Sequence, residues 1–225
     1  MPTSLTGPSV AAASGKTRQL VVLCHGYGSD GNDLIGLAPY WQRLLPDAAF
    51  VAPNAPEPCP GNPMGYQWFP IGRLDPDEIR RGVETAGPVL DRFIDAQLGL
   101  YGLDDANLAL VGFSQGTMMS LHVGLRRVRP PACIVGYSGA LAGPERLAAE
   151  IRGRPPVLMV HGDSDDMLPV ARMHQAVQAL GEAGLAVQWH VSAGLGHSID
   201  EVGLTMGGHF IADAIAGRLG TAAAG

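Results

Sequence analysis

The chain contains 225 residues, of which 46% are hydrophobic and 16% are charged, and its formal net charge is −6. This composition predicts one or two folded domains with a sizeable core and excludes an intrinsically disordered protein. The acidic balance argues against nucleic-acid binding, and no run approaches the roughly 18 apolar residues of a membrane-spanning helix.

Short apolar runs alternate with longer amphipathic segments along the chain. In order, we expect a strand at 19–24, a helix at 33–45, a strand at 48–52, a helix at 76–101, a strand at 108–111, a helix at 117–123, strands at 132–137 and 156–160, a helix at 170–183, a strand at 185–191 and a helix at 199–219. This alternation, with continuously apolar strands, predicts an α/β fold whose mostly parallel sheet is covered by helices on both faces.

The ends of the chain and one long loop differ from this pattern. We expect a flexible N-terminal tail at 1–17, a single domain at 18–219 and a C-terminal tail at 220–225, because small and polar residues dominate both ends. The loop at 53–75 is too long for a simple connection, and such loops are often functional. Its apolar side chains predict either a packed surface loop or one wall of a substrate pocket.

Cysteine and histidine spacing does not indicate a metal site or a disulfide framework. The three cysteines, Cys24, Cys59 and Cys133, are far apart and form no C-x-x-C pair. No two histidines have the H-E-x-x-H spacing of a zinc site. From this spacing we expect no bound metal. Reduced thiols are typical of the cytoplasm, so we also expect a cytoplasmic protein.

The segment Gly112-Phe113-Ser114-Gln115-Gly116 is the strongest functional signal. It lies between an expected strand and an expected helix, which is the setting of the G-x-S-x-G nucleophile elbow. The sharp turn crowds the residues two positions either side of the serine, so both must lack a side chain. The pattern therefore predicts that Ser114 is a nucleophile at the start of a helix, where negative charge is favoured.

Two later loops carry the groups that activate a serine, which needs a base to take its proton and an acid to orient that base. The loop after the strand at 156–160 contains Asp163, Asp165 and Asp166, and the position of these carboxylates alone does not select one. His197 follows the last strand and is preceded by glycine. The order serine, acid, histidine is that of the α/β-hydrolases.

The remaining histidines are expected to serve the fold and the loops around the site. We expect four of them to be structural, because they fall inside predicted helices or strands: His122, His174, His190 and His209. His161 is expected to support the backbone of the acid loop. His25 begins the glycine-rich loop at 25–31 that follows the first strand. An oxyanion hole needs two backbone N–H donors, and we expect one from this loop and one from Gln115.

Four segments together resemble the carboxylesterase/phospholipase/acyl-protein thioesterase family of α/β-hydrolases over nearly the whole chain. They are His25-Gly26-Tyr27-Gly28, Gly112-Phe113-Ser114-Gln115-Gly116, His161-Gly162-Asp163-Ser164-Asp165 and Gly196-His197-Ser198. The resemblance implies an α/β-hydrolase fold with a minimal cap, no cofactor and, as in many members, a homodimer. It also implies Ser114 as nucleophile, Asp165 as orienting acid and His197 as base.

The same resemblance implies roles for further residues. The backbone N–H groups of Tyr27 and Gln115 would form the oxyanion hole, and the candidate substrate-binding residues are Trp68, Phe69, Leu74 and Met167. Tyr27 stands where leucine is more usual, and Asp166 stands where a proline or small residue is usual.

The expected activity is hydrolysis of carboxylic esters through an acyl-serine intermediate. The substrate would be a small-molecule or lipid ester, and a lysophospholipid or an acyl thioester are among the candidates. Other hydrolase chemistry on this fold (amidase, lactone hydrolase or perhydrolase) and a non-catalytic binding module are the alternatives. No nucleic-acid partner and no integral membrane association are expected.

Overall fold

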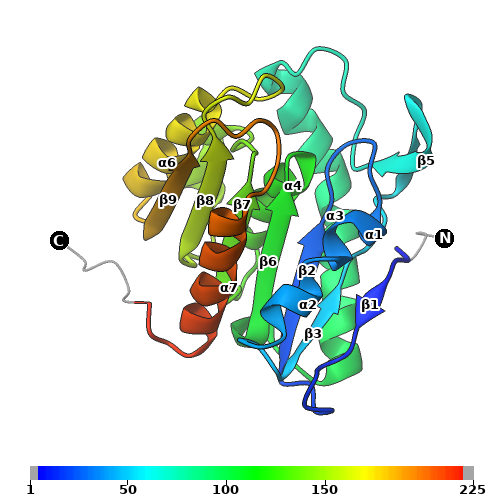
Figure 1. Ribbon diagram of the computed structural model, residues 1–225. Helices are drawn as coiled ribbons and strands as arrows, with labels where there is room; N and C mark the ends of the chain where they lie inside the picture. The colour runs from blue at the N-terminus through cyan, green and yellow to red at the C-terminus, as the bar shows by residue number, and fades with distance from the viewer. Residues whose placement is uncertain (1–4, 220–225) are drawn as a thin grey trace.

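A seven-stranded sheet forms the centre of the protein (Figure 1), whose computed structural model describes residues 5–219. The strands lie in the order β1-β3-β2-β6-β7-β8-β9. Their bounds are β1 Ser9–Val10, β2 Gln19–Cys24, β3 Ala48–Val51, β6 Leu108–Phe113, β7 Cys133–Tyr137, β8 Val157–Gly162 and β9 Val187–Ser192. Only β1 runs antiparallel to its neighbour, so the expected mostly parallel sheet is confirmed.

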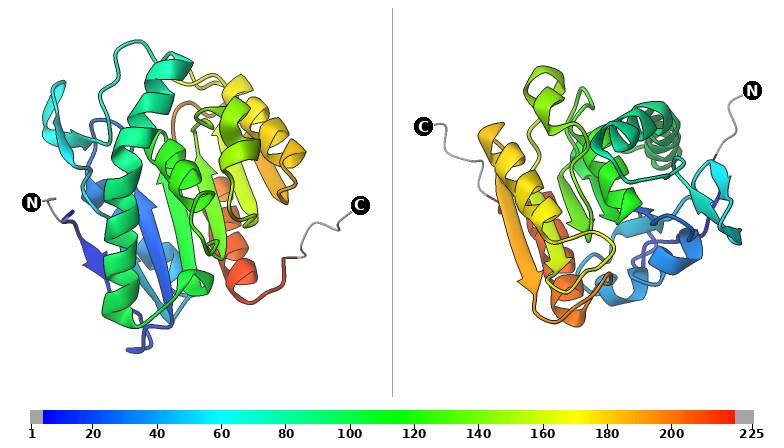
Figure 2. Two further views of the ribbon diagram at one scale, coloured as in Figure 1. Left: turned by 180° about the vertical axis from the view of Figure 1, so that it is seen from behind. Right: turned by 90° about the horizontal axis from the view of Figure 1, so that it is seen from above.

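Helices cover both faces of the sheet (Figure 2). One face carries α1 Gly31–Ile35, α2 Ala38–Trp41 and α7 Glu201–Ile215. The other carries α3 Pro76–Tyr101, α4 Gln115–Gly124 and α6 Ala171–Glu182, with the short α5 Leu147–Glu150. Strand β2 contributes to both cores, because its successive side chains point to opposite faces. Leu20 and Val22 pack under α3 and α4, whereas Val21 and Leu23 pack under α1, α2 and α7.

Helix α3 has the bounds expected from the sequence. The side chain of Asp75 accepts a hydrogen bond from the N–H of Glu78, and Pro76 occupies the first helical position, where its missing N–H costs nothing. Gly102 ends the helix in a left-handed conformation with φ of 66°.

The segment expected as one helix at 33–45 forms two short helices instead. Gly36 follows the end of α1, and Pro39 lies at the start of α2. Proline has no N–H to donate back into a preceding turn, so a continuous helix through this position is unfavourable. The apolar spacing continues across the break, which explains why it predicted a single helix.

The expected domain boundary at residue 18 is wrong. Residues 5–17 belong to the domain, because β1 pairs with β3 and Leu5 is buried in the core. The N–H groups of Ala52 and Asn54 donate to the carbonyls of Pro8 and Thr6. This segment is held largely by backbone hydrogen bonds. Because these bonds do not depend on the side chains, they produce no hydrophobic pattern in the sequence. The C-terminal tail expected at 220–225 lies outside the described residues.

The loop at 53–75 contains a hairpin that the sequence did not indicate. Its strands are β4 Glu57–Cys59 and β5 Asn62–Gln67. The hairpin stands beside the main sheet, and a bridge between Ser29 and Tyr66 joins it to the loop that follows β2. No helix in the described part of the chain is long and apolar enough to cross a membrane.

Candidate active site

Four loops that the sequence singled out meet at one edge of the sheet. They follow β2, β6, β8 and β9, and because these strands are parallel, their carboxyl ends all lie at the same edge (Figure 1). In open parallel sheets this edge is where ligands bind.

Ser114 lies in the tight turn between β6 and α4, with φ of 54° and ψ of −115°. Such a conformation is costly for a non-glycine residue and needs support from its surroundings. The N–H of Ser114 donates to the carbonyl of Tyr137 at 2.9 Å. A Cβ atom at Gly112 would lie 2.3 Å from the backbone of Gly116, and one at Gly116 would lie 1.8 Å from the carbonyl oxygen of Cys24. Both flanking glycines are therefore required by space.

The structure distinguishes among the three carboxylates of the acid loop. Asp165 is buried, with 6% of its surface exposed, whereas Asp163 and Asp166 are exposed. One oxygen of Asp165, Oδ2, lies 2.7 Å from Nδ1 of His197. The other, Oδ1, accepts the backbone N–H groups of Met167 and Leu168 at 2.9 and 2.8 Å.

Asp165 is kept ionised by these contacts. Burial alone would raise the pKa of its carboxyl group, but the hydrogen bonds from His197 and from the backbone outweigh burial and lower it below the ordinary value. An ionised carboxylate at Nδ1 of His197 fixes the ring with its hydrogen on that nitrogen. The opposite nitrogen, Nε2, is then available to accept a proton.

The acid loop and the histidine loop are tied to each other. A Cβ atom at Gly162 would lie 2.1 Å from the carbonyl of Leu195, so the glycine permits the close approach of the two loops. Asp163 accepts the N–H of Gly194 at 2.7 Å. The ring of Phe113, next to Ser114, packs against the ring of His197 with centroids 4.9 Å apart. These contacts place the turn that contains Ser114 beside the loops that carry Asp165 and His197.

The loop after β2 lies directly against the nucleophile turn. A Cβ atom at Gly26 would lie 3.3 Å from that of Ser114. The N–H of Tyr27 makes no hydrogen bond within residues 5–219, and Gln115, as the first residue of α4, has no acceptor for its N–H within the helix. The neighbouring Cys59 side chain raises the pKa of the Tyr27 phenol.

His25 supports this loop through two hydrogen bonds. Its Nε2 accepts the N–H of Ala55 at 3.0 Å, so its hydrogen is on Nδ1, which donates to the carbonyl of Gly26 at 2.7 Å. Burial lowers the pKa of His25, which favours the neutral ring that this pattern needs. The carbonyl of His25 in turn accepts the indole N–H of Trp68.

The side chain of Gln115 has a role that the sequence did not reveal. It is fully buried, and its amide accepts the N–H of Trp68 at 2.9 Å and donates to the carbonyl of Phe69 at 2.8 Å. These two bonds attach Trp68 and Phe69, which follow β5 of the hairpin, to the start of α4. Gln115 occupies the variable position of the motif, and no periodicity distinguishes a buried glutamine there from an exposed one.

Replacing Gln115 with alanine is expected to lower the free energy of unfolding by about 3 kcal/mol, because a buried donor and a buried acceptor lose their partner. Urea unfolding followed by tryptophan fluorescence measures this. Gln178→Ala is the matched control, since that glutamine bonds only to Glu182 on an exposed helix face. Equal effects of the two substitutions would contradict the role of the Gln115 amide.

The expected substrate-binding residues lie in different environments. Trp68 and Phe69 are only 1% and 2% exposed and belong to the core, so the expectation that they line a pocket is not supported. The ring of Trp68 lies beside that of His25, and the ring of Phe69 lies against Gly82 of α3. In an irregular loop no alternation shows which side chains point inward. Leu74 is half buried with φ of 56°, and Met167 is 63% exposed beside Asp165.

Within the described residues, no group of three or more His, Cys, Asp or Glu side chains is arranged to hold a metal ion. Cys24, Cys59 and Cys133 are free thiols, and all three are buried.

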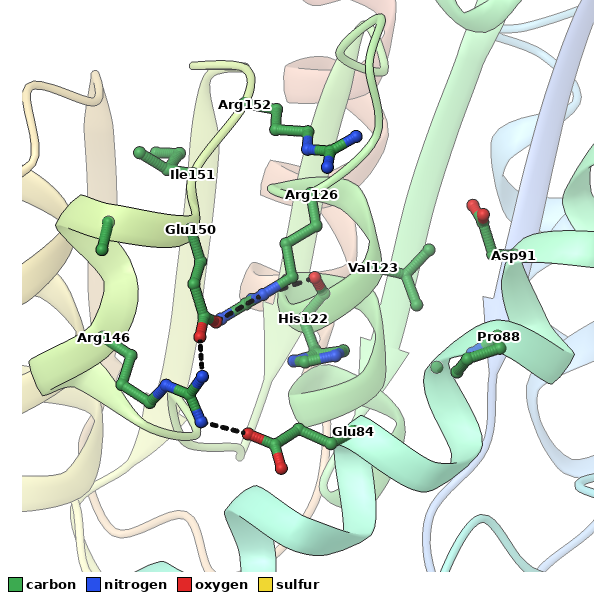
Figure 3. A pocket seen from close by; sticks show the side chains of 12 residues that line it. Glu84, Pro88, Asp91, His122, Val123, Arg126, Arg146, Glu150, Ile151 and Arg152 are labelled. Atoms are coloured by element: carbon green, nitrogen blue, oxygen red, sulfur yellow. Dashed lines mark hydrogen bonds and ion pairs between the residues drawn. The ribbon is translucent and has the colours of Figure 1, made fainter.

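A cleft of about 690 Å³ lies away from these loops, between α3, α4 and the segment around α5 (Figure 3). Four of its charged side chains pair with one another: Glu150 bonds to Arg126 and Arg146 at 2.6 Å each, and Arg146 also bonds to Glu84. His122 lines the cleft with its Nδ1 atom buried and without a partner in the described residues. Burial, followed by the charge of Arg126, lowers the pKa of His122 to about 4.

This shift predicts a loss of stability in acid. A histidine whose pKa is lower in the folded state than in the unfolded state stabilises the fold at pH values above its unfolded pKa of 6.5. This stabilisation is lost as the pH falls to about 4. When the pH falls from 7 to 4, the free energy of unfolding of the wild type is expected to fall by about 3 kcal/mol more than that of His122→Gln. Urea unfolding at both pH values tests this, with the exposed His209→Gln as control. A loss in His122→Gln equal to that of the wild type would refute the role of this histidine.

Comparison with known proteins identifies the family and the fold. Residues 5–215 match the model of the phospholipase/carboxylesterase family. The chain is 29% identical to acyl-protein thioesterase 1 of Gibberella zeae, over 90% of this chain and 95% of that protein. It is 28% identical to the esterase YpfH of Escherichia coli, over 81% of this chain and 77% of that protein.

A solved structure gives the same result. The crystal structure of esterase PE8 superposes with a TM-score of 0.91 at 46% identity, covering 94% of this chain and all of that one. The expected resemblance and the expected α/β-hydrolase fold are confirmed by these matches. The chain belongs to the phospholipase/carboxylesterase family.

Proposed function

We propose that the protein is a serine hydrolase that cleaves carboxylic esters through an acyl-serine intermediate. The observation that carries the proposal is the 2.7 Å hydrogen bond between Asp165 and His197, in loops tied to the strained turn of Ser114. Family membership supports the reaction class.

In the proposed mechanism, Nε2 of His197 takes the proton from Oγ of Ser114 as that oxygen attacks the ester carbonyl carbon. The tetrahedral intermediate collapses when His197 returns the proton to the leaving alcohol or thiol, which breaks the bond between carbonyl carbon and leaving group. His197 then removes a proton from water, whose oxygen attacks the acyl carbon. The bond from that carbon to Oγ breaks as His197 returns the proton to Ser114, and the carboxylic acid leaves. Asp165 stays ionised and stabilises the imidazolium that forms in each step.

The oxyanion that develops in both steps would accept the backbone N–H groups of Tyr27 and Gln115. The position of Gln115 at the first turn of α4 adds the favourable field of a helix N-terminus. Because both donors are backbone groups, the tyrosine side chain at position 27 leaves this function intact.

The substrate class within esters is tested by a panel. Candidates are small-molecule esters, lysophospholipids and acyl thioesters, which correspond to the names of the relatives. Rates on p-nitrophenyl esters of increasing chain length, on lysophospholipids, on long-chain acyl thioesters, on amides and on lactones separate these from one another. Turnover of amides or lactones in preference to every ester, or formation of a peracid from an ester and hydrogen peroxide in preference to hydrolysis, would replace the proposal with the corresponding chemistry. A folded protein that turns over none of them would favour a binding module.

A cytoplasmic location and a homodimer are further parts of the proposal. The three free, buried cysteines are compatible with a reducing compartment. Sedimentation equilibrium and cell fractionation test the two statements separately, and a monomer at micromolar concentration would remove the dimer from the proposal.

A further inference from the structure

Three consecutive peptide groups in the loop after β2 are each held at one end by a different partner. The indole N–H of Trp68 donates to the carbonyl of His25 at 2.9 Å, and Nδ1 of His25 lies 2.7 Å from the carbonyl oxygen of Gly26. The N–H of Gly28 donates to the carbonyl of Tyr66 at 2.9 Å. The middle peptide is therefore the one that a side chain of the loop itself holds.

The middle peptide joins Gly26 to Tyr27, and its two ends face opposite ways. No peptide bond in residues 5–219 is cis, so the carbonyl of Gly26 and the N–H of Tyr27 point in opposite directions. The carbonyl end faces the ring of His25, whereas the N–H end has no acceptor in the described part of the chain. A Cβ atom at Gly26 would lie 3.3 Å from that of Ser114, so this peptide lies beside the nucleophile turn. Whatever fixes the direction of the carbonyl also fixes the direction of the N–H.

The ring of His25 is itself held in one orientation. It is fully buried, and its Nε2 atom accepts the N–H of Ala55 at 3.0 Å. The hydrogen of the neutral ring is therefore on Nδ1, the atom that faces the carbonyl of Gly26. That carbonyl also accepts the N–H of Ser29, at the longer distance of 3.3 Å. The shorter bond is thus the one whose donor is anchored to a second segment of the chain.

We propose that His25 is a positioning residue, whose Nδ1–H holds the carbonyl of Gly26 and thereby directs the N–H of Tyr27 at the oxyanion. An oxyanion donor contributes only when it points at the developing charge. With only the longer bond left, the middle peptide can rotate while its neighbours stay held by Trp68 and Tyr66. The loss is then confined to the direction of one N–H. The role in catalysis rests on the proposed function, whereas the orientation of the peptide does not.

The test compares His25→Asn with His25→Leu, two side chains of nearly the same shape. Both lack an atom at the place of Nε2 and lose the bond to Ala55, but only the asparagine amide can donate to the carbonyl of Gly26. His25→Leu is expected to lower kcat for a p-nitrophenyl ester by about 10²-fold with little change in KM, because the lost interaction is made in the transition state. His25→Asn is expected to have a kcat about tenfold higher than that of His25→Leu. Equal losses in the two variants would overturn the proposal, because His25 would then act only through Ala55.

A mimic of the tetrahedral intermediate reports the donor directly. When an alkyl trifluoromethyl ketone adds to Ser114, a bond forms between Oγ and the ketone carbon, the serine proton passes to His197, and the ketone oxygen becomes an oxyanion. At saturating ketone, the amide proton resonance of Tyr27 is expected to move downfield in the wild type and in His25→Asn, and to move less in His25→Leu. A shift of the same size in all three proteins would contradict the proposal.

Two observations separate this inference from folding and from the proposed function. In the wild-type protein, the imidazole ¹⁵N shifts of His25 are expected to show hydrogen on Nδ1, and hydrogen on Nε2 would overturn the proposal even if neither variant folds. A folded wild type that hydrolyses no ester and forms no adduct would instead refute the proposed function, and with it the role of Tyr27 as an oxyanion donor. Hydrogen on Nδ1 would still be observed in that case.

Discussion

Ser114→Ala is expected to lower kcat for ester hydrolysis by on the order of 10⁶, because removal of the nucleophile of a triad eliminates the acyl-enzyme route. The residual rate would come from the oxyanion donors and from substrate binding. Steady-state hydrolysis of a p-nitrophenyl ester measures the rate, and labelling with a fluorophosphonate probe reports the reactive serine directly. Both signals should disappear in the same variant.

Ser138→Ala is the matched control for this experiment. Ser138 also lies at the carboxyl end of a central strand and has a positive φ of 45°, but it is fully buried and bonded to the carbonyl of Ser198. Its replacement is expected to keep the labelling and to change kcat less than tenfold. Labelling that persists in Ser114→Ala would show that another residue is the nucleophile.

Gly116→Ala is expected to lower the free energy of unfolding by about 3 kcal/mol and to abolish most of the activity. The new Cβ atom would lie 1.8 Å from the carbonyl oxygen of Cys24, and both groups are backbone-fixed, so the start of α4 must move away from β2. That movement separates the N–H of Gln115 from the loop of Tyr27. Chemical unfolding and kcat measured on the same preparation test the two effects.

Gly181→Ala separates this packing effect from the general effect of replacing a helical glycine. Gly181 lies inside α6, and a Cβ atom there would meet nothing within 4 Å. The substitution is expected to stabilise the protein by about 0.5–1 kcal/mol, because alanine favours the helix. If Gly116→Ala were as well tolerated as Gly181→Ala, the nucleophile turn would not depend on the close contact with Cys24.

Regular features of the chain could be predicted from its sequence because they leave a repeating pattern. The alternation of apolar strands and amphipathic helices predicted the parallel sheet, and the capping signals at Asp75 and Pro76 agree with the start of α3. The need of Ser114 for a base and an acid followed from the chemistry of a serine nucleophile, and their order along the chain is that of the α/β-hydrolases. The structure places these groups at one edge of the sheet, where parallel strands end.

Features that depend on tertiary contacts could not be predicted in this way. The choice among Asp163, Asp165 and Asp166 is a matter of burial, which a run of three similar carboxylates in a loop does not reveal. The inward rings of Trp68 and Phe69 follow an irregular backbone that has no period. Strand β1 is two residues long and is defined by its pairing with β3, so its side chains do not indicate a strand in the sequence.

The attachment of the hairpin limits how this part of the molecule can move. Its root is fixed at Trp68 and Phe69 by Gln115, and Tyr66 exchanges backbone bonds with Gly28 and Ser29. Its turn is attached as well: the side-chain amide of Asn62 donates to the carbonyl of Gly28 at 2.8 Å, and Cys59 is buried beside Gly28. Met64 projects between these contacts, with 81% of its surface exposed. A displacement of the hairpin would therefore carry along the loop that contains Tyr27 and Gly28, so the two are expected to move as one unit.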